Sequence, residues 1–593
     1  MNSSNTAFTL MLILMSSCLY IGKDEARGGG GSGDGGSDDG GADDGGSDDG
    51  GSDGGGSDDG GSDDTGDDCE SERLYFDEDG DGYGVSDNFV EECVGYPDHV
   101  PQAGDCADTD PTRNPGAVEA CGDGVDQDCD DVDPDCAWDG ALDLADVAGL
   151  RLDGEVPDAY IATALADAGD LDGDGDSELV LGSNQPYGYS GRLWVVDGDA
   201  SLSTAGEVTT AEVDHFTLSG TASAQFGAVA WGVGDLNGDG TDGFAVGLLD
   251  WPESAHSALL WFDGPLDASG TIEDAQRVFL LDVTTLSNSN GTEAAGGLGW
   301  NDAPVLLFGA SYHTGLNPYD GRAWLVEDPS SSTDAMVLDD EATVVFDATD
   351  MTEGTPDDRR LGAGVQLCDF SGDGLDEVVL AAGTASGAAT DAQSAIYLWY
   401  SDAALPSRPT WDDAGVIITG APLLGMPTLC GDLNGDGALE LVFASDQNNY
   451  QALVADGTYF SDPTVPPYEL ASSTLDYWLI PDDGRNNGQL TVVPNPFGDG
   501  QDHVVLADPY FDSSTVGRVW VMDGLPPGRA QDVTAGGDSV LATVYDTVGN
   551  LSGYQLQGLF DLDGDGYGDL AIGDGGHLPE DDGGRVHVMF GGP

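Results

Sequence analysis

Short loops rich in aspartate carry the clearest chemistry in this sequence. One copy contains Asp170, Asp172 and Asp174, then Gly175, then Glu178, which puts acids at positions 1, 3, 5 and 9 and a glycine at position 6. Carboxylate and carbonyl oxygens at this spacing can converge on one hard cation, and the glycine permits the tight turn. The spacing predicts calcium-binding loops, and the alternative is a set of solvated Asp-Gly turns without metal.

Five copies of this loop and one related Asp run near the N-terminus are candidate sites. The predicted metal ligands are Asp170, Asp172, Asp174, Asp176 and Glu178; Asp235, Asn237 and Asp239; Asp369, Ser371, Asp373 and Glu377; Asp432, Asn434, Asp436 and Glu440; Asp561, Asp563, Asp565 and Asp569; and Asp77, Asp79 and Asp81.

The copies differ in quality. Ser371 offers only a hydroxyl, and Asp176 would contribute its backbone carbonyl. The copy that opens at Asp235 has Gly243 at position 9, with Asp242 one place out of phase, so we expect weaker binding there. Position 12 is apolar in all five copies, whereas an EF-hand needs Glu at that position, so these loops are not EF-hands.

The loops belong to a long internal repeat. The small residue that closes the apolar run after each loop recurs seven times, at intervals of roughly 60–70 residues; it is Gly182, Gly247, Gly309, Ala381, Ala444, Ala507 and Gly573. Two of these units have degenerate loops, one near Leu298 and one near Asn495, where His503 occupies the loop. Each unit reads as four short strands with turn residues between them, which favours blades arranged around an axis.

These motifs resemble the FG-GAP repeats of integrin α-subunit propellers over most of the chain. The resemblance implies an all-β fold, a seven-bladed β-propeller over residues 138–593, with calcium loops on one face and ligands on the other. The last unit lacks a fourth strand, and residues 145–152 read as a strand without a unit. We expect this N-terminal strand to complete the last blade and to close the ring, because closure removes exposed edges.

Cysteine usage indicates export. Apart from Cys18, six cysteines crowd into one segment and two stand apart, at Cys368 and Cys430, immediately before the loops of neighbouring units. A disulfide between these two is the prediction, and two separately buried thiols are the alternative.

The N-terminal region has three expected parts. Residues 1–18 resemble a bacterial lipoprotein signal with Cys18 as the acylated residue, and an ordinary cleaved secretion signal is the alternative. Residues 19–68 are an expected disordered Gly/Ser/Asp linker. Residues 69–137 hold six cysteines and dense Asp clusters with few apolar residues, so disulfides and metal must stabilise this module.

The module resembles the MopE-like metal-binding motif of secreted bacterial proteins, through the runs that begin at Asp77, Gly104 and Asp123. That family is named for copper, but the ligands here are hard carboxylates, which suit calcium.

Charge restricts the partners. With 112 acidic and 15 basic residues, the chain has a formal net charge of −97, which disfavours nucleic acid and favours multivalent cations. The membrane would be reached only through a lipid anchor at Cys18.

We expect an exported cell-surface calcium-binding module for adhesion or ligand binding, and not an enzyme. Aromatic residues in the variable loops could form a surface for a glycan or protein ligand, or could pack locally; they are Tyr187, Tyr189, Trp251, Tyr312, Tyr319, Tyr510 and Phe511. The alternatives are a polysaccharide-active hydrolase or lyase on a propeller scaffold, and cation storage. No HExxH motif, nucleophile elbow or phosphate loop supports catalysis.

Overall fold

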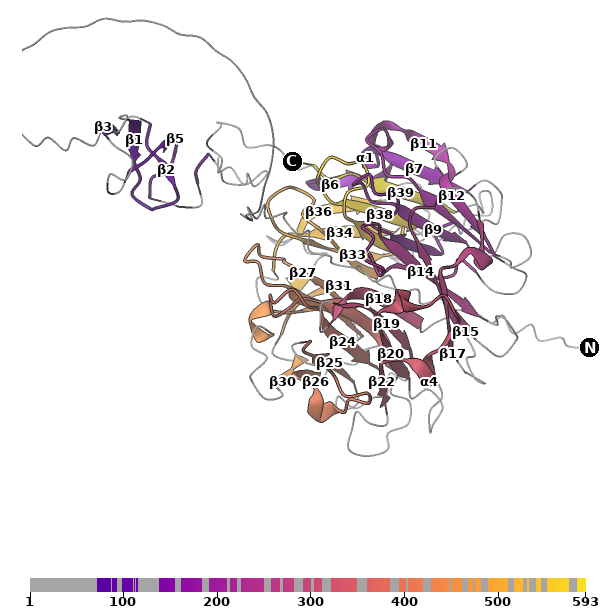
Figure 1. The fold of residues 1–593 in the computed structure, drawn as a ribbon. Helices are drawn as coiled ribbons and strands as arrows, with labels where there is room; N and C mark the ends of the chain where they lie inside the picture. The colour runs from indigo at the N-terminus through magenta and orange to yellow at the C-terminus, as the bar shows by residue number, and fades with distance from the viewer. Residues whose placement is uncertain are drawn as a thin grey trace, which may run out of the picture. The chain divides into compact units, whose positions relative to one another are not determined.

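A computed structural model describes residues 72–592 of the chain (Figure 1). Within that span the residues outside the description are 87, 93–96, 98, 110, 112, 116–128, 130–137, 155–160, 184–190, 211–213, 221–225, 250–256, 267–269, 282–291, 300–302, 312–320, 349–359, 384–393, 402–403, 420–427, 447–449, 461–467, 473–474, 481–488, 510–516, 526–530, 533–539, 546–551 and 575–583. The predicted signal, the acylated Cys18 and the linker therefore lie outside the described residues.

The chain divides into two compact units, and the smaller one contains the described residues 72–115 together with Cys129. Its strands are β1 (Glu72–Phe76), β2 (Tyr83–Gly84), β3 (Phe89–Glu92), β4 (His99–Val100) and β5 (Gln102–Ala103). They form a three-stranded sheet in the order β3-β1-β4 and a parallel pair of β2 and β5. A disulfide joins Cys106 to Cys129, which bears out the expected role of disulfides in this unit.

The larger unit consists of seven sheets among its described residues, and the first three strands of each sheet are successive in the sequence. In hydrogen-bonded order, the first sheet is β8 (Ala164–Asp167), β9 (Leu179–Ser183), β10 (Arg192–Val196), β12 (Asp214–Ser219) and β16 (Gly270–Thr271). The second is β13 (Ala230–Gly232), β14 (Gly243–Leu249), β15 (Ser257–Asp263), β17 (Arg277–Leu281) and β21 (Met336–Val337). The third is β18 (Thr292–Gly299), β19 (Ala303–Ala310), β20 (Arg322–Glu327) and β22 (Val344–Asp347).

The remaining four sheets follow the same plan. The fourth is β23 (Leu361–Cys368), β24 (Glu377–Ala382), β25 (Ala395–Trp399), β26 (Val416–Thr419) and β30 (Tyr468–Ala471). The fifth is β27 (Thr428–Gly431), β28 (Glu440–Asp446), β29 (Tyr450–Ala455), β31 (Asp476–Ile480) and β35 (Gln531–Asp532). The sixth is β32 (Gln489–Val493), β33 (His503–Asp508), β34 (Arg518–Met522), β36 (Val540–Tyr545) and β6 (Gly140–Asp143). The seventh is β37 (Ser552–Leu559), β38 (Asp569–Asp574), β39 (Arg585–Met589), β7 (Leu150–Asp153) and β11 (Gly206–Thr209).

Helices in the described part of the chain are short, as in α1 (Leu144–Val147) and α4 (Leu338–Glu341). None of these described helices is long and apolar enough to cross a membrane. The predicted all-β class is confirmed.

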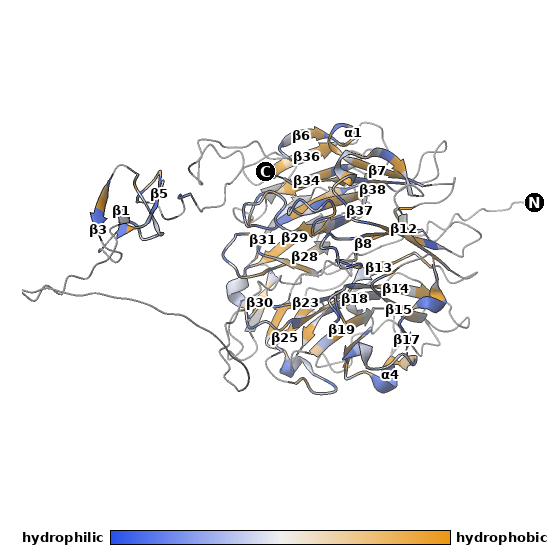
Figure 2. Cartoon of the chain, turned by 45° about the horizontal axis from the view of Figure 1, so that its top comes forward, coloured by the Kyte–Doolittle hydropathy of each residue, from blue (hydrophilic) through white to orange (hydrophobic). Residues whose placement is uncertain are grey.

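The second strand of each sheet is apolar on both faces because it is covered on both sides. In β24, for example, every residue from Glu377 to Ala382 is buried. The core is divided into clusters that each join one sheet to the next, and one cluster joins the seventh sheet to the first through side chains such as Leu152, Leu165 and Val586. Figure 2 shows this pattern as hydrophobic strands with hydrophilic turns.

A strand from the N-terminal part of the larger unit pairs with its C-terminal strand. Strand β7 pairs antiparallel with β39, with Leu150 opposite Val588, so the expected completion of the last repeat is confirmed. The strand is Leu150–Asp153 and not residues 145–152, because Leu144–Val147 form helix α1. Figure 1 shows the two strands side by side, purple beside yellow. Arg585 forms a bidentate ion pair with Asp153, and the indole of Trp138 donates a hydrogen bond to the carbonyl of Phe590 at 2.8 Å.

Neighbouring sheets also exchange outer strands. Six sheets have a fifth strand that is parallel to the fourth and comes from the following repeat, as in β16 on β12 and β11 on β7. At the corresponding place in the third sheet, the Val345 N–H donates to the Ser407 carbonyl. The predicted disulfide between Cys368 and Cys430 is confirmed, and it joins the first strands of the fourth and fifth sheets.

Candidate metal centres

Each Asp loop lies between the first and second strands of its sheet, and its own side chains hold its shape. The position 1 carboxylate accepts a hydrogen bond from the N–H of the position 6 glycine, at 2.8 Å for Asp369 and Gly374 and 2.9 Å for Asp561 and Gly566. Gly566 has a φ of +95°, a conformation that side-chain-bearing residues rarely adopt. The glycine at position 6 is therefore a backbone requirement of the loop.

The position 9 acid stands at the start of the second strand, and its side chain reaches back to the beginning of the loop. Glu178, Glu377, Glu440 and Asp569 are each at most 1% exposed. Each accepts a hydrogen bond from the N–H of position 2, as in the 2.7 Å contact from Leu562 to Asp569 Oδ2. Each of these carboxylates therefore lies beneath its own Asp cluster.

The electrostatics of these carboxylates call for a cation. Burial, reinforced by neighbouring aspartates, raises the pKa of Glu178 to about 9, of Glu377 and Asp569 to about 8, and of Glu440 to about 7. The Oε1 atoms of Glu178 and Glu377 are buried without a hydrogen-bond partner. A buried, incompletely hydrogen-bonded carboxylate is costly unless a positive charge compensates it. A metal ion in each loop would supply that charge.

Two loops bring three carboxylates together directly. In loops 170–178 and 561–569, one carboxylate oxygen from each of positions 1, 3 and 5 lies within 4.8 Å of the other two. Oδ1 of Asp563 is buried without a partner. The side chain of Asp176 lies against the other loop, because a Cβ at Gly564 would come within 2.5 Å of Asp176 Oδ1. Asp176 therefore lies between the two loops, and the charges of Asp174 and Asp561 both act on its carboxylate.

The other two loops with a position 9 acid have mixed donors at position 3. In loop 369–377 the Ser371 hydroxyl is buried without a partner, which leaves it free to face a cation. In loop 432–440 Asn434 accepts from the Asp436 N–H at 2.9 Å and donates to Glu440 Oε1 at 3.3 Å. Both loops therefore retain oxygen atoms at the predicted positions.

Loop 235–243 departs from this pattern, because Gly243 stands at position 9. Asp235 still accepts from the Gly240 N–H, and Asn237 links the two aspartates: its backbone N–H donates to Asp235 Oδ1 and its side-chain amide donates to Asp239 Oδ2. Asn237 also donates to the carboxylate of Asp263, at the end of β15 directly opposite Gly243. Sequence reasoning missed Asp263. A signal was available, because an Asp-Gly pair follows the third strand in several repeats.

Loop 495–503 is the degenerate copy in the sixth sheet, and it contains a histidine at position 9. His503 is 1% exposed, with Nε2 at 3.2 Å from Asp499 Oδ2 and Nδ1 at 2.9 Å from the Met522 carbonyl. Both partners can accept, and although burial lowers the pKa of His503, Asp499, the Met522 carbonyl and Asp523 together raise it above its usual value, which favours the imidazolium. Asn495 Oδ1 accepts from the Gly500 N–H at 2.9 Å, as the position 1 side chain does in the acid loops.

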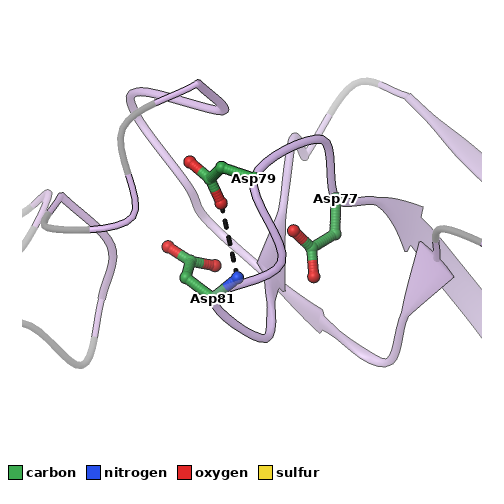
Figure 3. Close-up of side chains that lie close together, drawn as sticks. All are labelled: Asp77, Asp79 and Asp81. Carbon is green, nitrogen blue, oxygen red and sulfur yellow. Dashed lines mark hydrogen bonds between the residues drawn. The ribbon is translucent and has the colours of Figure 1, made fainter.

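The smaller unit has a related cluster. Asp77, Asp79 and Asp81 lie on the turn after β1, with carboxylate oxygens within 4.8 Å of one another (Figure 3). This loop too has no acid at position 9. Asp105, from a different segment, is 7% exposed, and its Oδ2 has no hydrogen-bond partner. Burial, with the charges of Asp81 and Asp79, raises the pKa of Asp105, so these carboxylates act on one another.

Among the described residues, the structure brings three predicted acids together in loops 170–178 and 561–569 and in the turn 77–81, and it leaves the acids of loops 369–377 and 432–440 farther apart. It also points to Asp105 and Asp263, which the sequence interpretation had not named as ligands. The aromatic residues expected to form a ligand surface lie in segments outside the described residues, and so does Cys18.

Comparison with known proteins gives one partial match. The family model Cu-binding MopE, described as "Putative metal-binding motif", matches residues 105–135, a span that begins in the smaller unit and contains both cysteines of the Cys106–Cys129 disulfide. The expected MopE-like resemblance of this module is therefore supported. No FG-GAP model matches, and no curated protein matches the chain.

Proposed function

We propose that the seven sheets form a closed β-propeller of the FG-GAP type. The support is a closed cycle of contacts between the first strands of the sheets. They contact one another in the order β8, β13, β18, β23, β27, β32 and β37, and β37 contacts β8. The core clusters between sheets and the exchanged outer strands follow the same cycle. A ring without free edges also accounts for the pairing of β7 with β39.

Calcium is the proposed ion of the acid loops. The observation that carries this proposal is the set of position 9 carboxylates, each at most 1% exposed beneath an Asp cluster and, in Glu178 and Glu377, with an oxygen that lacks a partner. The donors are carboxylate, amide, hydroxyl and carbonyl oxygens, which suit calcium and not copper or zinc. Each ion would fix the turn between the first two strands and neutralise mutually repelling aspartates.

The proposed role is binding or adhesion at the cell surface, after export and lipid attachment at Cys18, and not catalysis. Metal loops precede the second strand of a sheet, and the variable segments that join the second and third strands follow it, so the two lie at opposite strand ends. A calcium-fixed end would hold the scaffold while the opposite end presents variable loops to a glycan or protein ligand.

Thermal unfolding of the full chain, with calcium and after chelation, tests the calcium part. We expect a calcium-dependent rise in Tm and about four or five bound ions, because each ion that binds only the folded chain stabilises it by about 2.7 kcal/mol at 100 times its Kd. An unchanged Tm with no bound metal would contradict it. Binding of the calcium-loaded chain to glycan arrays and whole cells tests the adhesion part, which fails if no ligand is retained.

A further inference from the structure

Loop 235–243 lacks the acid that closes the other loops, yet a carboxylate occupies the corresponding space. Gly243 begins β14 and pairs with Asp263 across the β14–β15 ladder. A Cβ at Gly243 would lie 2.7 Å from the Phe262 carbonyl and from the Trp261 indole nitrogen. Position 9 therefore has no room for an acidic side chain.

Asp263 is placed to act in its stead. It is 6% exposed, its Oδ2 accepts from Asn237 Nδ2 at 2.5 Å, and its Oδ1 is buried without a hydrogen-bond partner. Burial, together with the charges of Asp239 and Asp235, raises its pKa to about 7. This carboxylate is directed at the Asp loop and has an oxygen available for a ligand.

The fifth sheet provides the converse arrangement. Asp456 follows β29 at the register position opposite Glu440, where Asp263 stands opposite Gly243. Its Oδ1 accepts from the Thr458 N–H at 2.9 Å, so this carboxylate serves its own turn. Glu440 is present at position 9 in that loop. Each loop thus receives one buried acid, from position 9 in the fifth sheet and from the facing strand in the second.

We propose that loop 235–243 binds a divalent cation through Asp235, Asn237, Asp239 and Asp263, with Asp263 replacing the position 9 acid. The donors then match those of loop 432–440: two aspartates, one asparagine and one buried acid. The inference rests on the calcium part of the proposed function, and it makes this loop a complete site in place of the weak one that position 9 alone predicts.

The test counts calcium bound per full-length chain, by equilibrium dialysis at fixed free calcium and elemental analysis. Four proteins are compared: the unaltered chain, D263N, D239N/D263N, and D456N as the matched control. We expect D263N to bind one ion fewer than the unaltered chain, the double variant also to lose only one, and D456N to lose none. Unfolding in chelator checks that D263N folds. Because the substitution removes a buried charge, its unfolding midpoint without metal should equal or exceed that of the unaltered chain.

Three results would overturn the inference. Equal calcium binding by D263N and the unaltered chain would refute the role of Asp263 and leave the other loops standing. Loss of two ions in the double variant would place Asp239 and Asp263 in different sites. Absence of bound calcium from all four proteins would refute the inference together with the calcium part of the proposed function.

Discussion

Loops 495–503 and 561–569 lie in adjacent sheets and share one backbone design, but they balance charge in different ways. In both, the side chain at position 1 accepts from the glycine N–H at position 6. At position 9 the first has His503, ion-paired with Asp499, and the second has Asp569, buried beneath Asp563 and Asp565.

The difference shows what this turn requires at its centre. Loop 495–503 contains its own cation, because the imidazolium lies between Asp499 and the Met522 carbonyl and also faces Asp523. Loop 561–569 contains only acids, and it needs a positive charge from solution. One repeat of the molecule thus indicates how the turn is held without metal, and the neighbouring repeat indicates where metal is needed.

The largest effect we expect is a pH dependence that calcium reverses. Burial raises the pKa of Glu178 to about 9 and of Glu377 and Asp569 to about 8, so the metal-free folded chain holds protons that the unfolded chain loses near pH 4. Its free energy of unfolding should fall as pH rises from about 4 to about 9, by about 1.4 kcal/mol per pH unit for each such group. Denaturant midpoints across this range measure the effect.

Calcium should remove that decline, because it stabilises the ionised carboxylates. Stability of the calcium-loaded chain should instead be lost as pH falls and protons displace the ion. A metal-free midpoint that stays level or rises with pH would contradict the assignment of these carboxylates as buried and uncompensated.

A substitution at position 9 should lower the free energy of unfolding in calcium and leave it unchanged or raise it in chelator. D569N removes one ligand from loop 561–569, so in saturating calcium we expect one bound ion to be lost and stability to fall by about 3 kcal/mol. In chelator the same variant should be as stable as the unaltered chain or more stable, because a buried charge has been removed. Paired denaturant titrations with and without calcium measure both values. An equal loss in the two conditions would make Asp569 a structural hydrogen-bond acceptor and not a ligand.

The repeat and its loops could be predicted from sequence because both depend on local patterns. Spacing identified Asp561, Asp563 and Asp565 as one cluster, and the short apolar runs identified the strands that flank it. One long-range strand pairing could also be predicted from the sequence. The last repeat lacked its own fourth strand, so an N-terminal strand such as β7 had to supply it. The disulfide of Cys368 and Cys430 followed from their equivalent places in neighbouring units.

The roles of Asp105 and Asp263 could not be predicted, because each depends on cross-strand or cross-segment placement. Gly243 looked like a defect in the loop, and only the β14–β15 register shows Asp263 opposite it. His503 was recognised as lying in a degenerate loop, but its two acceptors come from Asp499 and from the end of β34. Periodicity gives the position of a residue in a repeat and does not show which side chain from the next strand faces it.

The smallest expected change in stability is that of a substitution at His503, and it tests most directly whether loops 495–503 and 561–569 differ in their need for metal. H503Q keeps a polar side chain in loop 495–503 but removes the cation, so we expect a loss of about 1–3 kcal/mol that is the same with and without calcium. Burial alone lowers the pKa of His503, but the hydrogen bond and charge of Asp499, the Met522 carbonyl and Asp523 together raise it above its usual value. Its contribution is therefore complete below pH 6.5 and is lost as pH rises through the raised pKa.

Denaturant midpoints of H503Q and the unaltered chain at pH 6 and pH 9, each in calcium and in chelator, test this expectation. The variant should differ from the unaltered chain at pH 6 and approach it at pH 9. A difference that appears only in calcium would show that loop 495–503 also depends on metal. In that case the two loops would share one mechanism of charge balance, and the imidazolium would be an addition to the ion and not its replacement.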